Sequence, residues 1–284
     1  MQKYTLVITK HCLRSILYLL NLAGLFCTSV RDKKIGIVLS GGGARGFAHI
    51  GVLKALNENG IYPQIISAVS AGSIVASLYA DDKKPEQIYE IFEELDIYKF
   101  LRFYRPKFGL LKADGIRKTL GKNLSVENIE DLKIQTIISA TNFTKAQTDY
   151  FKKGSIIDAV MASSAIPLLL KPYMINGQMY VDGGLMNNLP VEPLDKQCDF
   201  IIGVNVNPVR EITRFRSFRN FADRVMHLAI RANVNMNISK CDMYIEPPGL
   251  MEYHLLKVSS AKEIFETGYE HTMMLIDKFN NDKI

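Results

Sequence analysis

Hydrophobic and polar positions along the chain follow two periods, which predicts short buried strands joined by helices. Five short stretches rich in apolar and β-branched residues are strand candidates: 35–39, 65–69, 134–140, 178–181 and 200–206. Seven stretches follow the helical period or begin at capping residues: 46–58, 72–80, 85–98, 114–121, 155–164, 218–238 and 260–279. Because strands and helices alternate, we expect right-handed crossovers and an α/β fold with three layers, α/β/α, around a mainly parallel central sheet.

The serine at position 70 stands between two apolar runs, 65–69 and 71–75, with small residues around it. This pattern is typical of a strand that turns sharply into a helix, where a serine hydroxyl is exposed above the helix N-terminus. The spacing is that of the G-x-S-x-G motif, with Gly72 in the last position and Ala68 in place of the first glycine. The sequence therefore predicts a nucleophilic serine at this corner.

Three consecutive glycines, Gly41, Gly42 and Gly43, follow the first predicted strand and precede the first predicted helix. Their unhindered N–H groups at a helix N-terminus make an anion site. One interpretation is an oxyanion hole, in which one donor is worth about 3 kcal/mol. The other is a dinucleotide site, since the spacing Gly41-x-Gly43-x-x-Gly46 matches its fingerprint. That site expects an acidic residue at the end of the second strand, and residues 60–79 contain none. We favour the oxyanion hole.

Asp182 ends the fourth predicted strand and is followed by Gly183 and Gly184. The usual role of an Asp-Gly pair is to cap its own turn. The alternative is a carboxylate directed out of the sheet edge. Ligands bind at the carboxyl ends of strands in open α/β sheets, and only the fold can bring Asp182 and Ser70 together there.

In their order along the chain these motifs resemble those of the patatin-like phospholipase family. The matching stretches are 40–46, 69–74 and 182–184, with weaker support from 162–167 and 187–191. The resemblance extends over about residues 34–245. It implies a patatin-like fold and the cleavage of fatty-acyl esters of phospholipids or related lipids. The implied mechanism is a serine–aspartate dyad that forms an acyl-enzyme, with no metal and no cofactor.

The resemblance also assigns roles to individual residues. It implies that Ser70 is the nucleophile, that Asp182 is the base, and that the amides of Gly41, Gly42 and Gly43 are the oxyanion donors. The remaining motif residues support this assignment: Arg45, Gly46, Gly72, Gly183 and Gly184.

Ala68 is the departure from the family pattern, because its methyl group occupies a tight turn. It leaves open a second function class, a catalytically weak or inactive lipid-binding relative on the same scaffold. A Ser-Asp-His triad is a further alternative, since His227 and His254 follow the aspartate in the chain. Neither histidine has a turn context, and we favour a structural role for both. His49 lies nearest to the predicted site in sequence and is given no role.

Composition and charge narrow the class of partner. The 284 residues are 48% hydrophobic, enough for a large core. The four cysteines have neither metal-ligand nor disulfide-framework spacing. The net charge of +6 indicates an anionic partner. Eight of the basic residues lie in 98–122, interleaved with aromatic residues.

We interpret 98–122 as a contact for an anionic membrane surface or as a loop whose rings fill the core, rather than as a nucleic-acid site. A second basic run, 210–224, flanks three phenylalanines and could join the same face or simply start a helix. The expected partner is a lipid ester substrate, and nothing in the sequence implies an obligate protein partner.

The two ends of the chain are expected to lie outside the catalytic domain. Residues 1–34 combine basic residues with an uncharged run, 15–30, that is short for a membrane span. This leader is interpreted as a signal peptide, an uncleaved membrane anchor or a packed amphipathic segment. Export or membrane association is favoured over the cytoplasm. We expect the catalytic domain over 35–245 and a helical extension over 246–284 that packs on it.

Overall fold

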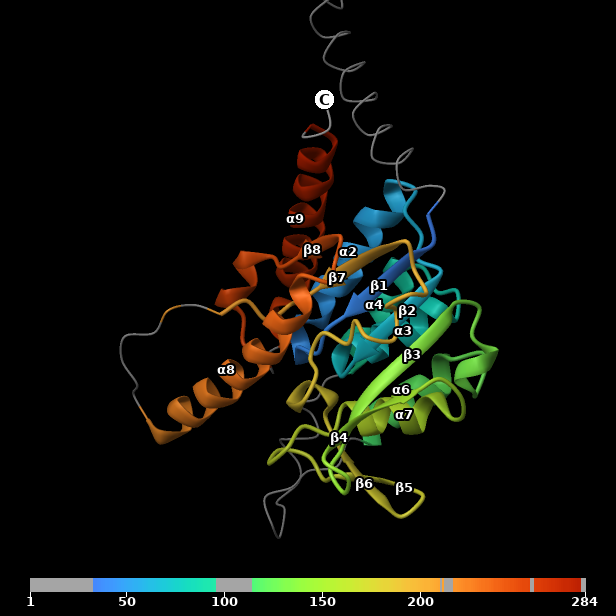
Figure 1. Cartoon of the computed structure of the whole chain (residues 1–284), viewed down its shortest axis with the longest axis vertical. Coiled ribbons are helices and arrows are strands. Elements are labelled where there is room, and N and C mark those ends of the chain that lie inside the picture. The colour runs from blue at the N-terminus through green and yellow to red at the C-terminus, as the bar shows by residue number, and fades with distance from the viewer. Residues whose placement is uncertain (1–32, 96–113, 210, 212–216, 256–257, 282–284) are drawn as a thin grey trace, which may run out of the picture.

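The computed structural model describes residues 33–95, 114–209, 211, 217–255 and 258–281, and these residues form a layered α/β structure around one sheet (Figure 1). The sheet has eight strands in the order β5-β6-β3-β2-β1-β7-β8, with β4 paired to β3. Five strands are parallel: β1 (Ile35–Leu39), β2 (Ile65–Val69), β3 (Gln135–Asn142), β7 (Phe200–Val204) and β8 (Met243–Ile245). The others pair antiparallel at one side: β4 (Gln147–Phe151), β5 (Tyr173–Ile175) and β6 (Gln178–Val181).

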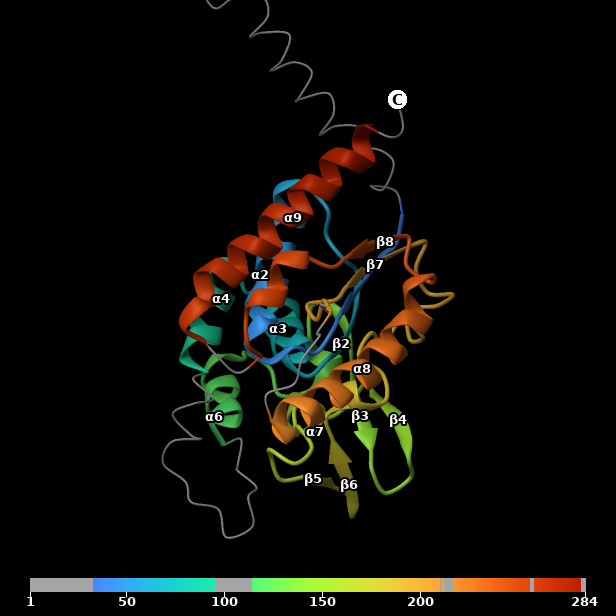
Figure 2. The same ribbon diagram turned by 90° about the vertical axis from the view of Figure 1, so that its left-hand side faces the viewer.

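Helices cover both faces of the sheet, as the alternating pattern predicts. One face carries the larger core and most of the helices: α2 (Gly46–Glu58), α3 (Ala71–Ala80), α4 (Pro85–Glu94), α6 (Asp114–Asn123), α7 (Ile156–Ser163) and α9 (Ala261–Asn281). The other face carries α8 (Phe218–Ile238) and a smaller core. Neighbouring residues of β1 point into different cores, Ile37 into the larger and Val38 into the smaller. In Figure 2 the helices α2, α3 and α4 lie on one side of the strands and α8 on the other. The expectation of three layers and a mainly parallel sheet is confirmed.

Most predicted elements are present, with ends that differ by a few residues. The largest difference at an end is α4, which stops at Glu94 instead of residue 98. The strands β4, β5 and β8 were not predicted. β5 and β8 have only three residues each, and β4 has no buried position, so none of them shows a hydrophobic period. Most of the leader 1–34, and residues 98–113 of the basic stretch, lie outside the described residues.

The length of β3 determines where the site forms. β4 and β2 both pair with Ile138 and Ser139, so these two strands lie on opposite edges of β3. β4 and β6 both pair with Thr141 and Asn142, so β6 shares the edge occupied by β2. β2 and β6 therefore run toward each other along this edge and both end beside Ala140, where the residues that follow the two strands meet.

The long C-terminal helix α9 crosses α2 at close range (Figure 2). A Cβ atom at Gly51 would lie 2.1 Å from the carbonyl oxygen of Phe265, and one at Gly268 would lie 2.3 Å from that of Ala48. Glycine at both positions lets the two backbones touch. The helix of the predicted extension is thus in contact with α2.

Candidate active site

Ser70 occupies a strained corner between β2 and α3. Its φ of 53° and ψ of −127° are values that residues other than glycine rarely adopt, and they direct the side chain away from the strand. A buried hydroxyl holds the corner in place: Ser163 Oγ accepts the Ser70 N–H at 2.7 Å and donates to the Ser139 carbonyl at 2.7 Å. The strand-to-helix turn around this serine has the form predicted from the sequence.

Ser70 Oγ donates a hydrogen bond of 2.6 Å to Asp182 Oδ2, across 112 residues of sequence. The backbone of Asp182 is fixed on both sides, because its N–H donates to the Ala165 carbonyl at 2.9 Å and its carbonyl accepts from Thr141 Oγ1 at 3.0 Å. Its second carboxylate oxygen, Oδ1, accepts the Gly184 N–H at 2.8 Å. The carboxylate is thus oriented toward the serine and also caps its own turn. The two roles that the sequence left as alternatives, a turn cap and an outward-directed carboxylate, are therefore compatible.

Burial changes the acidity of this carboxyl group. Only 9% of Asp182 is exposed, and the loss of solvation raises its pKa to about 6, although the hydrogen bonds from Ser70 and Gly184 act in the opposite direction. A carboxylate with this pKa is ionised at neutral pH and is a stronger base than an ordinary aspartate.

The glycine loop lies directly beside Ser70. A Cβ atom at Gly41 would be 3.0 Å from Ser70 Cβ and 2.7 Å from Asn188 Oδ1. The Gly41 N–H is already used, since it donates to Asn188 Oδ1 at 3.1 Å. Among the described residues, no hydrogen bond uses the N–H of Gly42 or Gly43. Of the three predicted oxyanion donors, Gly42 and Gly43 are therefore the two with an N–H available.

Two further motif glycines allow the segments to approach one another. A Cβ atom at Gly72 would lie 2.4 Å from the carbonyl oxygen of Leu39, so glycine lets α3 begin against the end of β1. A Cβ atom at Gly183 would lie 2.6 Å from the Ser139 carbonyl, so glycine lets the turn after Asp182 pass over β3. Side chains at either position would push the serine away from the glycine loop or from the carboxylate.

Asn188 was not predicted to belong to the site. It is 3% exposed and connects the glycine loop to α8, since its N–H donates to Asn233 Oδ1 at 2.9 Å. Its Nδ2 is buried and has no partner among the described residues. The sequence signal was present in the 187–191 stretch of the family pattern, but that pattern does not show which atom of the asparagine is used.

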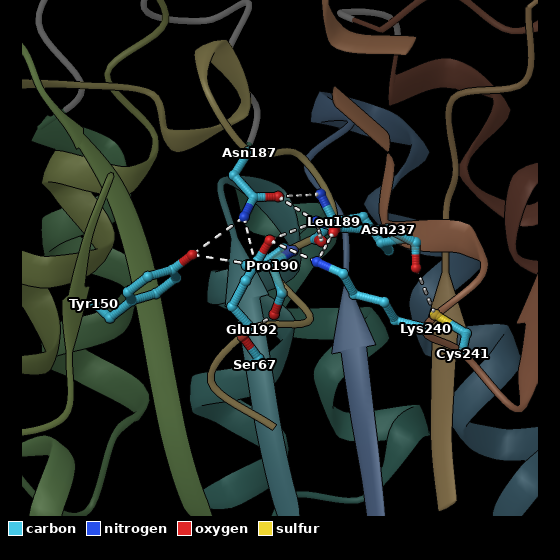
Figure 3. A network of polar contacts seen from close by, with 9 residues as sticks. All are labelled: Ser67, Tyr150, Asn187, Leu189, Pro190, Glu192, Asn237, Lys240 and Cys241. Atoms are coloured by element: carbon cyan, nitrogen blue, oxygen red, sulfur yellow. Dashed lines mark hydrogen bonds and ion pairs between the residues drawn. The ribbon is translucent and has the colours of Figure 1, made fainter. Parts of the chain in front are cut away.

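A polar network behind Asn188 fixes the segment that carries it (Figure 3). Glu192 Oε2 accepts from Asn187 Nδ2 at 2.7 Å, and Glu192 Oε1 accepts from Asn237 Nδ2 of α8 at 3.0 Å. Ser67 Oγ of β2 donates to the Pro190 carbonyl at 2.6 Å. Burial alone would raise the pKa of Glu192, but its hydrogen bonds and the charge of Lys240 hold that pKa below its ordinary value. The segment is therefore attached to the sheet through Ser67 and to α8 through an ionised carboxylate.

Segments late in the chain hold the other side of the glycine loop. Arg45, which is buried, donates through Nε and Nη2 to the Tyr253 carbonyl at 2.9 and 2.8 Å. The Leu255 carbonyl accepts the Ala44 N–H at 2.6 Å, and a Cβ atom at Gly43 would lie 2.2 Å from that oxygen. Gly43 also has a φ of +55°, which favours glycine. Residues beyond 245 thus shape the predicted oxyanion loop.

The remaining motif residues lie around this centre. Gly46 begins α2, and a Cβ atom there would be 2.6 Å from the Phe92 ring. Ala68 is fully buried in the larger core and its φ is not positive, so its methyl group leaves the corner at Ser70 intact.

Among the described residues, no histidine hydrogen-bonds to the hydroxyl or the N–H of Ser70, whose partners are Asp182 and Ser163. His49 is fully buried, and its Nε2 donates to the Ser40 carbonyl at 2.8 Å. Burial lowers the pKa of His49 to about 4, so the ring is neutral at pH 7. Within the described residues the site is a serine–aspartate pair beside a glycine loop.

The described residues contain no group of three or more His, Cys, Asp or Glu side chains arranged to hold a metal ion. Within the same ranges, no helix combines the length and the apolar character needed to cross a bilayer.

Fold and site together define an α/β protein with a serine–aspartate pair at a strand–helix corner. The family model described as patatin-like phospholipase matches residues 37–195, more than half of the chain, and the chain belongs to this family.

Similar proteins include lysophospholipase NTE1 of Meyerozyma guilliermondii, 30% identical over 271 residues, with 84% of this chain and 19% of that protein covered. Lysophospholipase NTE1 of Kluyveromyces lactis is 30% identical over 276 residues, with 86% and 19% covered. The chain therefore spans about a fifth of the length of these relatives. The crystal structure of VipD from Legionella pneumophila is similar with a TM-score of 0.58 and 19% identity, covering 87% of this chain and 67% of that one. At that identity the likeness concerns the fold alone.

Proposed function

We propose that this protein is a serine acyl hydrolase that cleaves fatty-acyl esters of phospholipids or lysophospholipids through a dyad of Ser70 and Asp182. The observation that carries the proposal is the 2.6 Å hydrogen bond from Ser70 Oγ to Asp182 Oδ2 at a strained corner beside the glycine loop. The lipid class is supported by the family and by relatives named lysophospholipases.

In the proposed first half-reaction, Ser70 Oγ attacks the ester carbonyl carbon and transfers its proton to Asp182. The negative charge that develops on the carbonyl oxygen is stabilised by the N–H groups of Gly42 and Gly43 and by the N-terminus of α3. The tetrahedral intermediate then releases the alcohol, which leaves with the proton from Asp182, and an acyl ester of Ser70 remains.

In the second half-reaction, water gives a proton to Asp182 and attacks the acyl carbon of the ester on Ser70. Collapse of the new tetrahedral intermediate breaks the bond to Ser70 Oγ, which recovers the proton from Asp182, and releases the fatty acid. The pKa of about 6 of Asp182 suits both directions of proton transfer at neutral pH.

Turnover of p-nitrophenyl butyrate and of lysophosphatidylcholine by the wild type and by Ser70→Ala and Asp182→Asn tests the proposal. We expect both variants to lose about 10²-fold or more of kcat while they remain folded. Ser77→Ala is the matched control, because within the described part of the chain this buried α3 hydroxyl bonds only in its own helix, to the Ser73 carbonyl at 2.8 Å. Full activity in Ser70→Ala would end the proposal. A wild type that binds lipid without turnover would support the non-catalytic relative instead.

A further inference from the structure

The helix α8 exposes an apolar face to solvent. Seven of its described side chains are exposed and six of these are apolar: Phe221, Val225, Leu228, Ala229, Ala232, Asn235 and Met236. Phe221, Val225, Leu228, Ala232 and Met236 follow one another at steps of three or four residues and form one stripe along the helix, called here the α8 stripe. Phe221 and Val225 are 49% exposed, Leu228 47% and Met236 75%.

The opposite face of α8 is already occupied. Val234 and Asn237 are buried, and Asn237 donates to the Leu189 carbonyl at 2.9 Å and to Glu192 in the network of Figure 3. A surface helix normally turns polar side chains to water on its second face. The α8 stripe is therefore an apolar surface beyond what the fold needs, and such surfaces mark interaction sites.

We propose that the α8 stripe docks on an anionic phospholipid surface. Charge favours this occupant, because residues 210–231 contain six arginines and two acidic residues, a net charge of +4. Arg224 and Arg231 are seven residues apart and therefore lie on one flank of the stripe. Arg231 is paired with Glu246, so among the described side chains Arg224 is the cation on this flank that would meet the headgroups. An apolar face bordered by arginine is the pattern of a helix that lies in the plane of a membrane interface, with its cations among anionic headgroups.

The position of α8 agrees with this partner. In Figure 1 the N-terminal half of α8, which carries most of the stripe, projects from the body of the protein. On the neighbouring side of the helix, Asn233 Nδ2 donates to the Gly184 carbonyl at 3.2 Å, and Gly184 in turn holds Asp182. Met186, two residues further along the same turn, is 41% exposed and adds apolar surface there. A membrane docked on the α8 stripe would lie next to the turn that follows Asp182. The proposed docking therefore deepens the proposed function, and it rests on that function for the identity of the substrate.

Vesicle flotation of the full chain tests the proposal. The protein carries Ser70→Ala, so that hydrolysis does not alter the vesicles, and the probes are phosphatidylcholine vesicles with and without about 20% phosphatidylglycerol. We expect binding to the anionic vesicles, and a loss of about tenfold or more on adding Val225→Asp and Leu228→Asp. Met274→Asp is the matched control, because Met274 is 57% exposed on α9, and its binding should equal that of the parent.

Further measurements separate the possible failures. Thermal unfolding shows whether the double variant is folded. If the double variant is unfolded, the single variant Leu228→Gln takes its place, and we expect it also to weaken vesicle binding. When the same α8 substitutions are made in the protein that retains Ser70, hydrolysis of soluble p-nitrophenyl butyrate should be unchanged. A wild type without esterase activity would count against the proposed dyad but not against membrane docking by the α8 stripe. Unchanged vesicle binding in the folded variants overturns the proposal. So does a dimer that these variants convert to monomer without loss of vesicle binding, because the stripe would then contact a second copy of the chain.

Discussion

Replacing Asp182 by asparagine is expected to stabilise the fold while it removes the proposed base. The carboxyl group has an ordinary pKa of 3.8 and a folded-state pKa of about 6, because it is buried. At 1.36 kcal/mol per pKa unit, keeping it ionised in the folded protein costs about 3 kcal/mol. Asparagine has the same shape and can still accept the Gly184 N–H. The variant avoids the charge, so its free energy of unfolding should exceed that of the wild type by up to about 3 kcal/mol.

The gain has a defined pH dependence. Between pH 3.8 and about 6 the folded protein retains a proton on Asp182 that the unfolded chain has lost. Wild-type stability therefore falls as the pH rises through this window, and the full deficit is present above pH 6. Below pH 3.8 the carboxyl group is neutral in both states, and the gain from asparagine should disappear.

Urea unfolding of the wild type and Asp182→Asn at pH 4 and pH 8 measures this difference. Asp149→Asn is the matched control with the opposite sign. Burial alone would raise the pKa of Asp149, but hydrogen bonds from Asn142, Gln147 and Tyr180 lower it, so its neutralisation should destabilise the protein at pH 8. An Asp182→Asn gain of equal size at both pH values, or no gain at pH 8, would refute the assignment of the cost to a buried charge.

Four further outcomes follow from the geometry of the site. The kcat/KM for a soluble ester should rise with pH through an apparent pKa near 6, because Asp182 must be ionised to accept a proton; a limb above pH 7 would contradict this. His49→Gln keeps a donor for the same carbonyl, so turnover should stay within about threefold of the wild type, whereas a loss of about 10²-fold would assign the base to this histidine. Asn188→Ala should lower kcat about tenfold or more with KM little changed, since the glycine loop loses the acceptor that orients it, and equal kcat would remove the asparagine from the site. Gly72→Ala should lower the free energy of unfolding by about 2 kcal/mol or more, because the added methyl group meets backbone atoms. Gly121→Ala on α6 should not lower it, because the nearest neighbour of the added methyl group is 3.7 Å away. Equal effects of the two substitutions would show that the close approach at Gly72 is unimportant.

The sequence predicted best those features whose backbone conformation depends on residues adjacent in the chain. The small residues around Ser70 predict the corner, and the three glycines predict a loop that must approach another backbone. Both features depend on neighbours in the chain, so a pattern can show them.

Features that depend on distant segments could not be predicted in the same way. The pKa of Asp182 follows from its burial by residues far away in the chain, and an isolated Asp-Gly-Gly carries no trace of it. The use of the Gly41 N–H by Asn188 is a single contact across 147 residues. The strands β4, β5 and β8 take their form from the edges they pair with, and their own residues give too short or too polar a pattern.

The carbonyls of Tyr253 and Leu255 fix Arg45 and Ala44 beside the glycine loop, and this has a consequence for how the protein is made. On the ribosome, the corner serine, the glycines and the aspartate are all synthesised before those two carbonyls exist. The glycine loop therefore lacks these two contacts until residues 253–255 have been synthesised. On the proposed mechanism, a nascent chain that contains every motif residue but not these two carbonyls is expected to be inactive toward esters.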